Sequence, residues 1–146
     1  MFTKEGDKWF HHWLVNGQRD FALIPAGVMR GFDVDLPVRL QNGNPYSFGY
    51  THIEKRMKWV KSISEGIPEL IYAKLGQSGQ VWSTELESKI KIVMHLAPEA
   101  MLVLTEQDRT RQGGDRYLSV TTIYNPRGSA HLDGELIGRY QSEFRI

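Results

Sequence analysis

Residues 89–96 read Lys-Ile-Lys-Ile-Val-Met-His-Leu, and this stretch sets the character of the second half of the chain. Ile90, Ile92, Met94 and Leu96 occupy alternate positions, as in a β-strand that buries one face, and 89, 91, 93 and 95 face the other way. Before Gly76 the apolar residues recur at helical spacing instead. We therefore expect helices first and a sheet from residue 80 onward.

Further strands are predicted on both sides of this stretch. They cover residues 80–83, 101–106 and 116–125, and a polar hairpin loop at 107–115 joins the last two. The connections are too short for parallel crossovers, so the sheet should be an antiparallel meander. Residues 129–146 remain open between a helix, which suits Leu132, Leu136, Ile137 and Tyr140, and an added edge strand.

Two helices are predicted before the sheet. Thr51 and Glu54 have the spacing of a capping box, which predicts Thr51 as the N-cap of a helix that runs to about residue 64. Gly66 separates it from a second helix that has Pro68 in its first turn and ends before Gly76.

The first 47 residues have weaker signals. Trp9, Phe10, Trp13 and Leu14 favour a short helix that begins after Asp7 and ends at Gly17, and a hairpin turn at Asn16-Gly17 is the alternative. Residues 21–24 suit a strand or a loop. Residues 36–40 suit a short strand, which Pro37 places at an edge, and 41–47 form a loop.

The predicted architecture is α+β, with N-terminal helices packed on an antiparallel sheet of about four strands. The length of 146 residues suits one domain, 1–146. The formal net charge is +1, so no overall field indicates a nucleic-acid partner. The absence of cysteine excludes disulfides and thiol nucleophiles. No signal peptide or membrane-spanning run is visible, and we expect a cytoplasmic protein.

The start of the first helix carries the strongest chemical signal. His52, Arg56 and Trp59 lie along one side of that helix, near the end where free N–H groups attract anions. An imidazole and a guanidinium one turn apart suit a phosphate group, and a basic run that includes Lys55 adds to this. The alternative is that His52 is a cap or surface residue. The neighbours His11 and His12 point apart on a helix and would chelate a metal poorly, so no metal or cofactor is expected.

The predicted strand at 116–125 offers a second set of polar groups. Val120, Thr122 and Tyr124 should share one face of it, and 119, 121 and 123 the other. If the His52 helix crosses that face, the two hydroxyls would meet His52 and Arg56; otherwise Thr and Tyr are simply good strand formers. Arg109 and Arg111 in the hairpin loop are either solvated or in contact with a nucleic-acid backbone.

Two segments together resemble a known family. The segments Gly-Tyr-Thr-His-Ile-Glu-Lys-Arg (49–56) and Leu-Ser-Val-Thr-Thr-Ile-Tyr-Asn-Pro (118–126) resemble the phage and polymorphic-toxin nucleases of the barnase–EndoU–colicin E5/D–RelE (BECR) superfamily. The likeness covers residues 36–126, the nuclease-like core, and leaves 1–35 as an N-terminal extension. Many relatives have a second histidine where this chain has Met57.

The resemblance implies a metal-independent endoribonuclease, a toxin or phage-encoded effector that leaves a 2′,3′-cyclic phosphate. It assigns His52, Arg56, Thr122 and Tyr124 to catalysis, and we add Lys55, Trp59, Arg109 and Arg111 as substrate-binding residues. Expected partners are RNA, for example tRNA, and a cognate immunity or antitoxin protein. The alternatives are a non-catalytic nucleic-acid-binding module and a phage structural or accessory module that keeps the fold.

Overall fold

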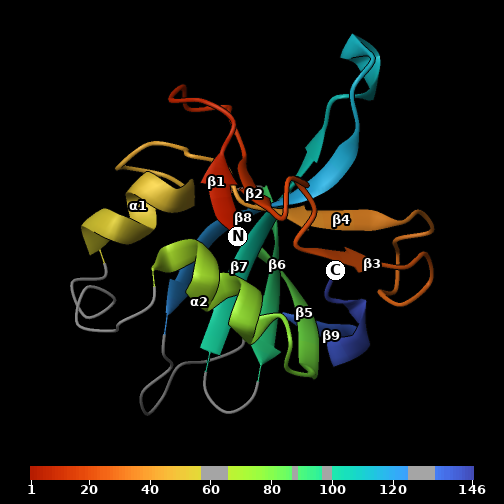
Figure 1. Ribbon diagram of the computed structural model, residues 1–146. Coiled ribbons are helices and arrows are strands. Elements are labelled where there is room, and N and C mark those ends of the chain that lie inside the picture. The colour runs from red at the N-terminus through yellow and green to blue at the C-terminus, as the bar shows by residue number, and fades with distance from the viewer. Residues whose placement is uncertain (57–65, 87–88, 97–99, 125–133) are drawn as a thin grey trace.

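The computed structural model describes residues 1–56, 66–86, 89–96, 100–124 and 134–146, and Figure 1 shows their arrangement. The elements in chain order are β1 (Phe2–Lys4), β2 (Trp13–Val15), β3 (Ala22–Ile24), β4 (Leu36–Arg39), α1 (Gly49–Arg56), α2 (Ile67–Lys74), β5 (Gly79–Leu86), β6 (Lys89–Leu96), β7 (Ala100–Asp108), the 3-10 turn η2 (Thr110–Gln112), β8 (Arg116–Tyr124), β9 (Glu135–Tyr140) and the 3-10 turn η3 (Ser142–Phe144).

The predicted fold class is wrong, because the described chain is mostly β. A mixed sheet of seven strands has the order β3-β4-β8-β7-β6-β5-β9, and β1 and β2 form a separate two-stranded sheet. The meander predicted from the short connections is confirmed for β5 to β8, which pair antiparallel. The strand predicted at 36–40 is present as β4, but the prediction did not place it in this sheet, where it pairs parallel with β8. The strands β3 and β9, which the sequence left open, form the two edges.

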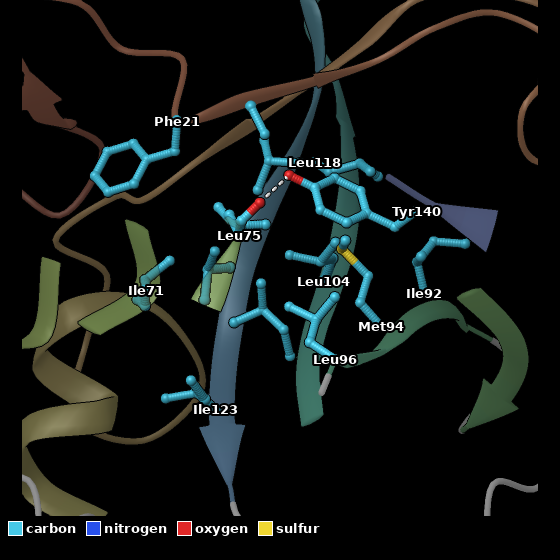
Figure 2. Packing of buried hydrophobic residues seen from close by; sticks show 14 of the residues in the cluster. Phe21, Ile71, Leu75, Ile92, Met94, Leu96, Leu104, Leu118, Ile123 and Tyr140 are labelled. Carbon is cyan, nitrogen blue, oxygen red and sulfur yellow. Dashed lines mark hydrogen bonds between the residues drawn. The ribbon is translucent and has the colours of Figure 1, made fainter. Parts of the chain in front are cut away.

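The core follows the alternation of the central strands. Ile92, Met94 and Leu96 of β6 lie in the hydrophobic core, as predicted, while Val93 is outside that cluster. Ile71 of α2 and Leu75, the residue after it, pack on the same face of the sheet (Figure 2). The helix α2 begins with proline in its first turn, as predicted.

The strand β4 is not an edge strand, although it contains Pro37. It lies between β3 and β8. Its pairing with β8 involves Val38 and Arg39, whereas Pro37 faces Leu23 of β3. Proline is tolerated here because it precedes the ladder to β8, where a missing N–H would otherwise cost a hydrogen bond.

The helix predicted before Gly17 is also wrong. Residues 2–4 and 13–15 are paired strands, and the alternative, a turn at Asn16-Gly17, is what the structure has. The backbone φ angles of Asn16 and Gly17 are 51° and 81°, as a two-residue hairpin turn requires. The backbones of Val15 and Gln18 exchange two hydrogen bonds across it.

The C-terminal ambiguity is resolved in favour of a strand. β9 pairs with β5 and forms one edge of the large sheet. Tyr140 at its end is buried, and its hydroxyl donates to the Leu75 carbonyl at the end of α2, at 2.6 Å (Figure 2). This bond ties the last strand to the helix that covers the sheet.

Candidate functional site

The helix α1 packs against β8, so the two elements that carry the sequence motifs adjoin. His52 lies in the middle of α1 and Thr122 near the end of β8. Trp59 lies outside the described residues. The predicted adjacency of helix and strand is therefore present at the level of the elements.

His52 is 7% exposed, and its Nδ1 lies 3.3 Å from the Pro45 carbonyl oxygen. A carbonyl oxygen can only accept, so in the neutral ring Nδ1 carries the proton and Nε2 keeps a lone pair. This is the tautomer that a general base acting through Nε2 needs.

Two cations stand on the exposed part of the same helix. Lys55 and Arg56 form the last described turn of α1, and both are exposed. The Lys55 ammonium lies 4.5 Å from the centre of the Tyr46 ring. Lys55 and Arg56 thus offer positive charge to an anion that approaches from solvent, about one helical turn after His52. His52 itself is buried, as is its neighbour Ile53.

Two N–H groups in the first turn of α1 are already bonded to the protein, so they are not available to the expected anion. The helix starts at Gly49, two residues before the predicted N-cap Thr51. The N–H groups of Tyr50 and Thr51 donate to the carbonyls of Gln41 and Asn42, both at 2.9 Å. The preceding loop therefore caps the helix with its own backbone.

A bulge changes the predicted faces of β8. Its register against β7 shifts between Val103 and Leu104, so Thr121 is the extra residue. Consequently Ile123, and not Thr122, shares the core with Val120. The expectation that Val120 and Thr122 share a face is wrong for this reason, and Thr122 is partly buried opposite Val103.

A small pocket lies between the loop before α1 and the non-core face of the sheet. We call it the sheet pocket; its volume is about 260 Å³ and its lining residues are Ser47, Phe48, Lys91, Thr105, Gln107, Ser119 and Thr121. The Thr105 and Thr121 hydroxyls are 2.9 Å apart, and the Lys91 ammonium donates to the Thr105 hydroxyl at 3.4 Å. An ammonium and several hydroxyls could bind phosphate oxygens here.

The remaining predicted residues are spread along β8 and the hairpin. The backbone of Tyr124 pairs with Met101. Arg109 and Arg111 are exposed at the far end of the β7–β8 hairpin, which projects away from α1 in Figure 1. Six residues of strand separate Thr122 from Arg116 at that end, or about 20 Å. The structure thus does not bring the loop arginines to His52.

Arg109 lines a larger cleft, which the sequence analysis missed. We call it the N-terminal cleft; its volume is about 770 Å³ and its lining residues are Glu5, Trp9, Phe10, His11, His12, Arg19, Arg39, Gln41, Arg109, Gly113, Gly114, Asp115 and Tyr117. The residues come from the N-terminal segment, from β4 and Gln41 two residues after it, and from the β7–β8 hairpin. The cleft was missed because the aromatic residues at 9–14 have helical spacing, which predicted a helix in place of the strand and loop found here.

Within the cleft, Glu5 and His12 form a pair. Glu5 Oε1 lies 3.1 Å from His12 Nδ1 and accepts the His12 backbone N–H at 2.9 Å, while Arg19 Nε donates to Glu5 Oε2 at 3.1 Å. Burial lowers the pKa of His12, although Glu5 opposes this shift. Burial would raise the pKa of Glu5, but the hydrogen bonds from His12 and Arg19 lower it overall. The pair is therefore an ionised carboxylate beside a neutral imidazole.

The cleft also contains a buried arginine. Arg39 donates from Nε to Asp20 at 2.6 Å and from Nη2 to Asp115 at 2.9 Å. Its guanidinium carbon lies 4.9 Å from the centre of the Tyr117 ring, whose edge-on neighbour is His12 at 5.4 Å between ring centres. These contacts hold the wall of the cleft rigid.

The two cavities share a wall. Gln41, which lines the N-terminal cleft, accepts the Ser119 hydroxyl of the sheet pocket at 2.8 Å. Trp9 of the cleft contacts Phe48 of the pocket, with ring centres 6.4 Å apart. The N-terminal cleft and the sheet pocket are therefore neighbours, separated by these side chains.

Comparison with known proteins adds no assignment: no protein-family model, curated protein or solved structure matches the chain. Among the described residues, no group of three or more His, Asp or Glu side chains is placed to hold a metal ion. None of the helices in the described ranges is long and apolar enough to cross a membrane.

Proposed function

We propose that the protein is a metal-independent endoribonuclease, a toxin or phage-encoded effector that acts in the cytoplasm of a host or target cell. The observation that carries the proposal is the packing of α1 against β8, the two elements that bear the nuclease-like motifs. The reaction would start with removal of the ribose 2′-OH proton. The 2′-oxygen would then attack the adjacent phosphate and break its bond to the 5′-oxygen, which takes a proton from water, so that a 2′,3′-cyclic phosphate and a free 5′-hydroxyl remain.

His52 is the proposed base, because the Pro45 carbonyl on Nδ1 leaves Nε2 unprotonated. Arg56 would stabilise the charge that develops on the phosphate, since an exposed guanidinium offers paired donors to its oxygens. Lys55 and the threonines of the sheet pocket would bind neighbouring phosphate oxygens. Thr122 and Tyr124 are proposed to position the scissile phosphate from β8, and a cognate immunity protein would cover this face.

A non-catalytic nucleic-acid-binding module is the second candidate. The burial of His52 favours it, because a ring that is 7% exposed suits a structural role beneath the Pro45 carbonyl. The basic turn of α1 would serve binding equally well in either case. Turnover therefore separates the two candidates.

The test is incubation of purified protein with total RNA in EDTA, followed by analysis of the ends of the fragments. We expect discrete fragments that end in 2′,3′-cyclic phosphate. Arg56→Ala should reduce the cleavage rate about 100- to 1,000-fold, as loss of a donor to the developing charge does.

Arg139→Ala is the matched control. Arg139 is exposed on β9, four strand spacings from β8, or about 19 Å. Arg139→Ala removes the same charge as Arg56→Ala and should leave the cleavage rate within about twofold, because exposed charges a Debye length or more away are largely screened. Equal losses in both variants would mean that overall charge, and not a site at α1, drives the reaction. RNA binding without fragments would favour the binding module.

A further inference from the structure

The N-terminal cleft has no part in the proposed chemistry, yet it combines features that point to a ligand. It is built by three separate segments, and hydrogen bonds hold several of its side chains, among them those of Glu5, His12 and Arg39. Asn42 donates its amide to the Gly6 and Lys8 carbonyls, both at 2.9 Å. The Gly43 N–H donates to the Trp9 carbonyl, also at 2.9 Å. The loop that carries Trp9 is thus held in place by the loop before α1.

The first feature is a buried acceptor with no partner. His12 is 5% exposed, and its Nε2 is buried without a hydrogen-bond partner among the described residues. Because the ionised Glu5 carboxylate can only accept, His12 Nδ1 carries the ring proton and Nε2 keeps its lone pair. A buried acceptor left unpaired is costly, and an N–H group from a ligand would satisfy it.

The second feature is an aromatic surface at the same cleft. Trp9 is 53% exposed and Phe10 is 45% exposed, with ring centres 5.5 Å apart. Large aromatic side chains on a fixed loop provide flat faces on which nucleobases stack, and such stacking depends little on base identity.

The third feature is positive charge. Arg109 lines the cleft and is exposed, and its Nη2 donates to the side-chain oxygen of Gln107, a neutral group, so this bond leaves its charge uncompensated. Arg19 and Arg39, in contrast, are paired with carboxylates. Arg109 is thus the cation best placed to meet a phosphate.

We propose that the N-terminal cleft binds one unpaired nucleotide of a single-stranded RNA. Its base stacks on Trp9 and Phe10 beside His12, and Arg109 contacts the adjoining phosphate. This inference rests on the proposed function for the identity of the strand, and the cleft and the sheet pocket are neighbours across the contacts of Gln41 with Ser119 and of Trp9 with Phe48. The cleft would then hold the substrate a few nucleotides from the cleavage point.

The test measures binding without cleavage. A fluorescein-labelled RNA octamer with 2′-O-methyl groups lacks the attacking hydroxyl, so its anisotropy reports binding alone. Trp9→Ala should raise the Kd about 5- to 150-fold, the range for the loss of one base-stacking contact. Arg109→Ala should also raise the Kd, and it should make the Kd depend less steeply on salt concentration.

Leu136→Ala is the control, since Leu136 is an exposed apolar residue on β9, at the far edge of the sheet. It should leave the Kd unchanged. If Trp9→Ala binds the octamer like the unmodified protein, the cleft proposal is overturned, whatever the cleavage assay gives. If Trp9→Ala lowers affinity but no RNA is cut in EDTA, the cleft proposal stands and the ribonuclease proposal fails.

Discussion

The hydrogen bond from Tyr140 to Leu75 provides a stringent test of how the C-terminal strand is held. Tyr140 is buried, and its hydroxyl lies 2.6 Å from the Leu75 carbonyl oxygen (Figure 2). That carbonyl belongs to the last turn of α2, where carbonyls have no partner within the helix. Tyr140→Phe keeps the ring and its packing but removes the donor.

The expected cost follows from what is left behind. A buried acceptor that loses its partner costs about 1–3 kcal/mol, more than the net value of an average hydrogen bond. No cavity forms beyond the lost oxygen, so the packing contribution is small. For a domain of this size each kcal/mol corresponds to about 2–4 °C in Tm.

Urea unfolding followed by circular dichroism measures this cost. Tyr140→Phe should lower the free energy of unfolding by about 1–3 kcal/mol with an unchanged slope. Tyr46→Phe is the control, because Tyr46 is exposed and its ring contact with Lys55 survives; it should stay within about 0.5 kcal/mol. A loss below about 0.5 kcal/mol in Tyr140→Phe would show that the Leu75 carbonyl finds water, and that β9 is not fixed to α2 as argued.

Two further predictions concern stability. Burial lowers the pKa of His12 from 6.5, so the stability it contributes is fully present above pH 6.5 and is lost as the pH falls from there through the folded-state pKa. The decline can reach about 1.4 kcal/mol per pH unit for one proton; Glu5, Arg19 and Arg39 are the charged groups that face the ring. His12→Gln should make the free energy of unfolding, measured by urea titrations between pH 7.5 and 5.5, fall less steeply with falling pH. An identical decline in the variant would mean that another group titrates. Separately, a Cβ on Gly79 would come within 2.0 Å of the His95 carbonyl oxygen, so Gly79→Ala should cost more than about 2 kcal/mol by forcing β5 from β6, and an unchanged urea midpoint would contradict that spacing.

The parts of the fold that follow local rules were predictable. The strand at 89–96 and its buried face, the proline that opens α2 and the polar hairpin at 107–115 each follow from residues that are neighbours in the sequence. For these elements the period of the apolar residues and the turn residues contain the information.

The parts that depend on distant partners were not predictable. Residues 9–14 have helical spacing, but β2 gains its backbone hydrogen bonds from β1, a pairing that neither the predicted helix nor the alternative hairpin at Asn16-Gly17 included. β4 pairs parallel with β8, about eighty residues later, and no local pattern encodes that choice. The bulge at Thr121 likewise arises from the register of two strands, so a strict alternation misplaced Thr122.

The candidate site was predicted in its elements and not in its extent. The adjacency of α1 and β8 agrees with the motif order, whereas the N-terminal cleft depends on residues brought together from three segments. The only sequence signal for that cleft was the cluster of aromatic and imidazole side chains at 9–12. On the predicted helix these side chains would point in different directions, so they did not indicate a common site.

The contacts of the loop before α1 explain why the N-terminal segment cannot be regarded as an appendage. Gln41 donates its amide N–H to the Phe10 carbonyl at 3.1 Å and accepts the Ser119 hydroxyl, so one buried side chain bridges the segment and β8. The same loop caps the first turn of α1. A chain without the first residues would therefore leave Gln41 and Asn42 with buried groups unpaired, which disfavours the loop conformation that starts the helix. The N-terminal segment thus positions His52 and forms the cleft at once, and changes in it should act on both sites.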